Sequence, residues 1–155
     1  MSPAMLTWRN LHLADAVICD ELNARLAADT GCSLTEHDLM AWLAAAPGQR
    51  LRMADLAARL RVTPGGLTRI ADRLATRGWI ERDRPPGNRR EVHVTLTRTG
   101  TAARLAARSA YSRVLRNTLA RHLNAHDLET LGTITGKLLG QLAAEHELHC
   151  LPATR

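Results

Sequence analysis

The sequence predicts a mainly α-helical fold with a small β component, an α+β arrangement. Apolar residues recur at helical spacing over most of the 155 residues. This periodicity is interrupted between residues 79 and 96, where a short alternating pattern predicts two strands. Hydrophobic residues make up 45% of the chain and charged residues 23%, proportions typical of a folded globular domain. At this length we expect one compact fold with extended terminal helices.

Two helices are expected in the first third of the chain. The first begins near Trp8 and ends around residues 29–31. The second follows residues 35–38 (Thr-Glu-His-Asp), which we interpret as a capping box, and it ends at the Pro-Gly pair of residues 47–48. Four apolar residues mark the inward face of the first helix at multiples of three and four positions: Leu11, Ile18, Leu22 and Leu26.

A short helix over residues 53–60 precedes the most informative junction, residues 61–66. Thr63 is a good N-cap because its hydroxyl can accept from a free backbone N–H, and Pro64 suits the first helical position, where no N–H is needed. A helix is therefore predicted from Pro64 to Arg77, with Gly78 as its left-handed stop. Its inward stripe is Leu67, Ile70, Ala71 and Leu74. The opposite face carries Thr68, Arg69, Asp72, Arg73 and Arg77, and it is expected to have nothing to pack against.

The two predicted strands, residues 79–82 and 92–96, are joined by a loop over 83–91 with basic residues at its tip. Beyond them, Thr97 is expected to cap a long helix and residues 124–127 a last one, with a frayed tail after Glu145. Two short helices followed by a twisted hairpin describe a winged helix-turn-helix with a two-stranded β-wing. Because the major groove of B-DNA admits a helix, the helix that starts at Pro64 is expected to read DNA.

The charge distribution agrees with this interpretation. Residues 50–98 carry twelve basic and five acidic side chains, whereas residues 1–49 carry two basic and six acidic ones. Twenty of the 21 basic residues are arginine, whose guanidinium suits bidentate contact with phosphate or guanine. A positive block of this kind favours a phosphate-binding surface over a merely solvated face once the helix and wing lie within it.

Six segments follow one another in a recognisable order and spacing: Leu56–Leu60, Val62–Pro64, Leu67–Ile70, Asp72–Leu74, Arg77–Arg82 and Leu96–Gly100. With these segments the chain resembles the MarR family of transcriptional regulators over about residues 33–145. The resemblance implies a homodimer that places one winged helix on each half-site of a palindromic operator, most simply a repressor relieved by a small aromatic or acidic effector. It assigns residues 1–32 to an N-terminal dimerisation helix, 33–98 to the DNA-binding region, 99–146 to C-terminal dimerisation helices and 147–155 to a tail.

The expected site residues form two groups. Glycines in a first helical turn cost stability, so a close approach to DNA is a reasonable compensation for Gly65 and Gly66. Asn88 stands where the family commonly has an acid that orients the wing arginine, so the charge-assisted part of that contact is lost. The residues expected on DNA are Thr63, Pro64, Gly65, Gly66, Thr68, Arg69, Arg73, Arg89 and Arg90. Trp8, His12, Trp42 and Tyr111 are expected either to line an effector cleft or to pack in the core.

Other classes of function have weaker support. The sequence shows no catalytic motif, no cofactor is expected, and residues 1–10 lack a signal-peptide pattern, so a cytoplasmic non-enzyme is expected. A metal site at His146, His149 and Cys150 is disfavoured because these residues lie in the predicted tail. The alternatives left open are a module that compacts DNA non-specifically or binds protein, and a redox-sensing regulator using Cys19, Cys32 or Cys150.

Overall fold

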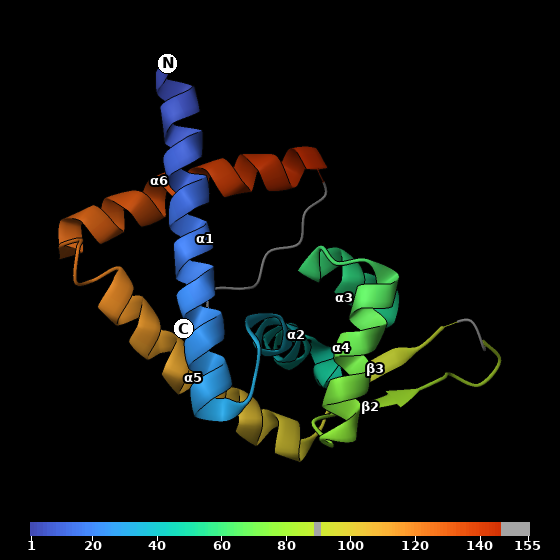
Figure 1. Cartoon of the computed structure of the whole chain (residues 1–155). Coiled ribbons are helices and arrows are strands. Elements are labelled where there is room, and N and C mark those ends of the chain that lie inside the picture. The colour runs from blue at the N-terminus through green and yellow to red at the C-terminus, as the bar shows by residue number, and fades with distance from the viewer. Residues whose placement is uncertain (89–90, 147–155) are drawn as a thin grey trace.

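The computed structural model describes residues 1–88 and 91–146, which form a helical body from which a β-hairpin projects (Figure 1). It confirms the predicted α+β class. The elements in chain order are α1 (Pro3–Thr30), α2 (Leu34–Ala45), the 3-10 turn η1 (Pro47–Gln49), β1 (Arg50–Arg52), α3 (Met53–Leu60), α4 (Pro64–Thr76), β2 (Ile80–Asp83), β3 (His93–Leu96), α5 (Arg98–Thr118) and α6 (Ala125–His146).

The sheet has one more strand than the sequence predicts. Its order is β1-β3-β2, and both pairings are antiparallel, with Val94 of β3 opposite Leu51 on one side and Arg82 on the other. The three residues of β1 are too few to show an alternating pattern, which is why the sequence predicts only the two strands of the hairpin. The added strand ties the root of the wing to the segment that leads into α3.

The first two helices begin at positions other than those predicted. α1 starts at Pro3 rather than near Trp8, and the hydroxyl of Ser2 caps it by accepting from the backbone N–H of Met5. The capping box of α2 uses Ser33 and Glu36, not residues 35–38: Ser33 Oγ accepts from Glu36 N at 3.1 Å, and Ser33 N donates to Glu36 Oε2 at 2.9 Å. Both Ser33-x-x-Glu36 and Thr35-x-x-Asp38 have cap-like chemistry, and the structure uses the pair with glutamate at the N3 position, three residues after the cap.

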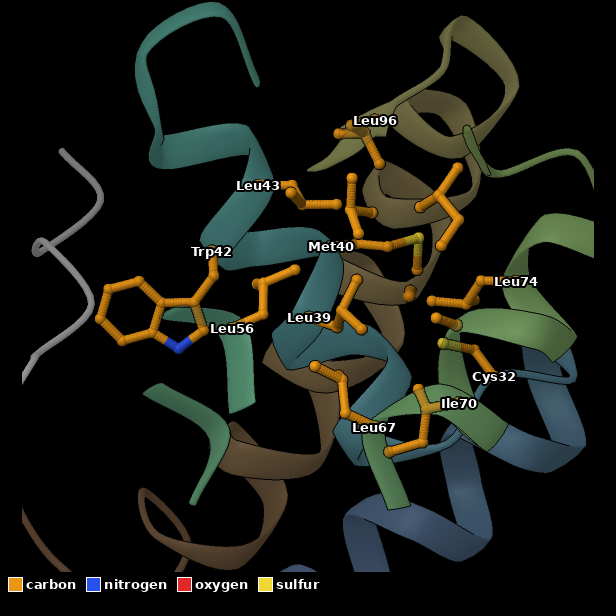
Figure 2. Close-up of a cluster of buried hydrophobic side chains, with 14 of the residues drawn as sticks. Cys32, Leu39, Met40, Trp42, Leu43, Leu56, Leu67, Ile70, Leu74 and Leu96 are labelled. Carbon is orange, nitrogen blue, oxygen red and sulfur yellow. The ribbon is translucent and has the colours of Figure 1, made fainter. Parts of the chain in front are cut away.

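The core is centred on α2, whose side chains Leu39, Met40 and Leu43 are fully buried (Figure 2). The predicted inward stripe of α4, residues 67, 70, 71 and 74, is confirmed, because all four side chains are buried against this centre. Gly78 adopts a φ of 68° just after α4 and is the left-handed stop that the sequence predicts. The apolar side of α4 is therefore closely packed in the core, and its polar side faces outward.

A close backbone contact fixes the wing root to α5. Gly100, in the first turn of α5, lies so near β2 that an added Cβ would stand 1.9 Å from the carbonyl oxygen of Trp79. The cap residue Thr97 and the neighbouring Thr99 both donate to the carbonyl of Gly78, at 2.7 and 2.6 Å. Only glycine permits this approach at position 100, so the end of α4 and the start of α5 keep one geometry.

Two helical segments leave apolar side chains uncovered. On α6 an exposed stripe consists of Leu131, Ile134, Leu138, Leu139 and Leu142. On the first half of α1 the exposed apolar residues are Met5, Leu6, Trp8, Leu11, Leu13 and Val17. Neither feature makes a membrane segment: within residues 1–88 and 91–146, each helix falls short of the length and apolar character needed to cross a bilayer.

Candidate nucleic-acid interface

The start of α4 is built as the sequence predicts. Thr63 Oγ1 accepts from the backbone N–H of Gly66 at 3.1 Å, and Pro64 occupies the first helical position. A Cβ added at Gly66 would crowd that same threonine oxygen at 3.1 Å, so this glycine protects the cap. A Cβ added at Gly65 would meet no atom within 4 Å. Nothing inside the described chain therefore requires glycine at position 65, and its lack of a side chain leaves the helix start open toward the outside.

The N-terminal half of α4 presents two polar side chains to solvent. Thr68 is exposed, and its hydroxyl donates to the carbonyl of Pro64 at 2.9 Å. Arg69 is exposed and makes no side-chain hydrogen bond or ion pair with any described residue. Because the five guanidinium donors of Arg69 have no acceptor in this part of the protein, they are available to an external one.

The C-terminal half of the same face is occupied, contrary to expectation. Arg73 Nε donates to Glu36 Oε1 at 2.9 Å, and Asp72 pairs with Arg82 of β2 at 2.7 Å. Arg77 donates to the carbonyl of Gly31 at 2.7 Å, and its guanidinium lies 4.8 Å from the ring centroid of Trp79. The expectation that this face packs on nothing is wrong here, because its arginines find partners on other elements.

Glu36 has a role that its place in the predicted cap of residues 35–38 does not indicate. Its side chain is 3% exposed, although glutamate side chains normally lie at the protein surface. The sequence does contain the capping box Ser33-Leu-Thr-Glu36. A capping box predicts that Glu36 bonds to the start of its own helix, but it does not predict the second bond, to Arg73 of α4.

Asn88 stands where the family resemblance implies an acid, and in the structure the nearby Glu91 supplies one to the wing. Asn88 Nδ2 donates to Glu91 Oε2 at 3.0 Å, and Glu91 Oε1 accepts from Arg52 Nε at 2.9 Å and pairs closely with His93. The hydrogen bond with His93, together with the charge of Arg52, holds the pKa of the Glu91 carboxyl below its usual value. The predicted wing-tip contacts Arg89 and Arg90 lie outside the described residues.

The four residues expected near an effector are not gathered into one site within the chain. Trp8 and His12 stack on each other along exposed α1, with ring centroids 5.6 Å apart. Trp42 is buried in the core, on the side of α2 that faces α3 (Figure 2), and Tyr111 stacks on His37 at 4.7 Å. For Trp42 the structure therefore favours the core-packing alternative, and an effector site remains a prediction.

The model of the MarR family matches residues 30–91. The MarR family transcriptional regulator Sco3205 of Streptomyces coelicolor, solved in complex with DNA, is 26% identical, with 92% of this chain and 93% of that chain covered and a TM-score of 0.77.

Two structures of MarR from E. coli are also similar. A cysteine-to-serine mutant in complex with operator DNA is 26% identical, with 84% of this chain and 91% of that chain covered and a TM-score of 0.70. The wild-type apo form is 27% identical over 84% and 94% of the two chains, with a TM-score of 0.73. No curated protein matches the sequence.

Proposed function

Because this chain belongs to the MarR family of winged-helix transcriptional regulators, we propose that it is a sequence-specific DNA-binding repressor that works as a homodimer. The family assignment agrees with the expectation of a regulator and not an enzyme. The proposed reading elements are α4, in the major groove, and the wing, in contact with phosphates or the minor groove.

The observation that carries the proposal is the exposed N-terminal half of α4. Arg69 and Thr68 project from a helix whose opposite side is fixed in the core, and Gly65 leaves the helix start open. An arginine without an internal acceptor, next to an accessible helix N-terminus, matches the chemistry of a guanine edge and its neighbouring phosphate. Both DNA-bound relatives in the comparisons share this fold.

The homodimer is supported by the uncovered apolar faces of α1 and α6. On α6, Leu131, Ile134, Leu138 and Leu142 lie at helical spacing on one side and remain between 37% and 60% exposed. A stripe of this kind costs free energy in water unless another surface covers it. A second copy of the chain would do so and would set two α4 helices about 34 Å apart, one helical turn of DNA. Sedimentation of the purified protein should give the mass of a dimer.

Relief of repression by a small aromatic acid would act by population shift. A ligand that binds better to a dimer whose α4 spacing no longer matches successive grooves lowers operator affinity by that difference in binding free energy. Thermal-shift screening against aromatic acids tests for such a ligand. A hit should both raise the melting temperature and weaken DNA binding.

The experiment that tests the proposal compares two DNA duplexes over a salt series. One contains a palindrome from the protein's own promoter region or selected by the protein from a random pool, and the other is a scrambled sequence. Specific binding predicts tighter association with the palindrome at every salt concentration. Equal affinities with equal salt dependence would favour the alternative of a non-specific DNA-compacting module.

The redox alternative finds little support at the two described thiols. Cys32 is buried, and burial, with a smaller contribution from Glu36, raises the pKa of its thiol to about 12. Burial and the nearby Asp15 raise the pKa of Cys19 as well. A reactive thiol is usually a thiolate, so both should stay protonated and slow to oxidise. Cys150 lies outside the described residues. Titration of a Cys150→Ser variant with a thiol reagent at neutral pH should show Cys32 reacting only on unfolding and the half-exposed Cys19 reacting more slowly than a free thiol.

A further inference from the structure

Glu36 is the buried carboxylate that the proposed mechanism leaves without a role. Within residues 1–88 and 91–144, Glu36 is the only acidic residue that is buried. Its two oxygens serve different elements: Oε2 accepts from Ser33 N at 2.9 Å and closes the cap of α2, whereas Oε1 accepts from Arg73 Nε of α4 at 2.9 Å. The second bond links residues 37 positions apart in the chain.

Arg77 extends the same junction. Its Nη1 lies 3.8 Å from Glu36 Oε2 and donates to the carbonyl of Gly31, the left-handed residue that ends α1. The guanidinium also covers the ring of Trp79, just before β2. The end of α1, the start of α2, the last turn of α4 and the start of the wing are therefore joined around one carboxylate.

The capping role alone does not explain a buried glutamate. A capping box needs one acceptor oxygen, which glutamine supplies equally well, and glutamate is in general mostly exposed. Burying a carboxylate is costly unless charged partners and hydrogen bonds compensate. Here the compensation comes from Arg73 of α4 and from Arg77, which caps the end of α4, so the negative charge is explained by its hold on that helix.

We propose that Glu36 is a positioning residue for DNA recognition, which fixes the orientation of α4 relative to the end of α1 through Arg73 and Arg77. The inference rests on the proposed function, because α1 is the helix on which the dimer is proposed to be built. The carboxylate then sets how the two α4 helices of a dimer are spaced and tilted. Its loss should lower discrimination between DNA sequences more than overall attraction to DNA.

The test substitutes Glu36→Gln. Glutamine can accept from Ser33 or from Arg73, but its amide NH₂ cannot accept, so the cap and the hold on α4 can no longer both be made. Measured well below the melting temperature, the ratio of affinities for selected palindrome and scrambled duplex should fall about fivefold or more. Affinity for the scrambled duplex should stay or rise, because two arginines are released from a carboxylate.

Asp38→Asn is the matched control. Asp38 lies on the same helix and pairs with His37 at 3.0 Å, so the variant makes the same charge change without touching α4. It should leave the ratio of affinities as in the wild type. An equal fall of the ratio in both variants would overturn the inference, because charge alone would then explain it.

A second variant covers the case in which Glu36→Gln does not fold. Arg77→Lys keeps the charge but loses the fork that reaches Gly31 and Glu36 while stacking on Trp79. It should reduce the same ratio in the same direction. An unchanged ratio in either folded variant, with a wild type that discriminates, overturns the inference alone. A wild type that does not discriminate overturns the proposed function, and this inference with it.

Discussion

The two halves of α4 carry similar side chains in different circumstances. In the N-terminal half, Arg69 stands free of described partners, and the glycine at 65 opens the surface. In the C-terminal half, Arg73 and Arg77 are bound to α2 and to the end of α1. The polar face of one helix is thus divided into a part that is available to a ligand and a part that holds the helix in place, although the sequence presents both as exposed arginines.

The largest effect on binding is expected from Arg69→Ala. Loss of a bidentate base contact costs about 1–3 kcal/mol, so affinity for the selected palindrome should fall by about fivefold to a hundredfold in a fluorescence anisotropy titration. The melting temperature should not change, because no described residue depends on this side chain. Arg121→Ala, an exposed arginine between α5 and α6, is the control for loss of charge. An affinity within twofold of the wild type would place the reading surface elsewhere.

Arg73→Ala should lower the stability of the protein, which Arg69→Ala should leave unchanged. Removing a partner of a buried acceptor costs about 1–3 kcal/mol of unfolding free energy. For a chain of this length we expect the midpoint of thermal unfolding to fall by about 2–4 °C for each kcal/mol. The matched control is Arg69→Ala, the same change on the same helix. If the two variants melted together, the division of α4 into a free and a held half would be untenable.

Thr63→Ala should destabilise the N-terminal half of α4, because it removes the N-cap of that helix. The lost N-cap bond to Gly66 is worth about 1 kcal/mol. Circular dichroism melts should show this loss, and Thr63→Ser, which keeps the hydroxyl, should recover most of it. A serine variant as unstable as the alanine variant would show that the methyl group and not the cap matters.

The smallest effect is expected at the two adjacent glycines, 65 and 66. There a substitution by alanine should raise stability at one position and lower it at the other. Gly65→Ala meets no atom of the described chain and replaces a poor helix former, so unfolding free energy should rise by up to about 0.5–1 kcal/mol while DNA affinity falls severalfold. Gly66→Ala crowds the Thr63 hydroxyl and should lower stability instead. Unchanged DNA affinity in Gly65→Ala would remove the argument that this position is kept open for DNA.

Local signals predicted much of this fold. The Thr63-Pro64 start, the Gly78 stop and the inward stripe of α4 depend on neighbours within one or two helical turns, and the structure confirms all three. The MarR resemblance also rests on such local segments, and the family model matches most of them.

The errors arose where a residue's partner is distant in the chain. The acceptor of Arg73 is 37 residues earlier, and β1 exists only because β3 pairs with it. The predicted cap of α2 lies two residues too late because two cap-like pairs, starting at 33 and 35, differ little in sequence, and the structure uses the pair that ends in glutamate. Periodicity identifies which face of a helix is polar, but not which polar groups are satisfied by the rest of the protein.

The most direct measurement is a crystal structure of the protein on its selected palindrome. We predict that α4 lies in the major groove with the Arg69 guanidinium within hydrogen-bond distance of a base edge or phosphate, while Arg73 remains on Glu36. A complex in which Arg69 faces solvent and the released Arg73 contacts the bases would contradict this account of α4.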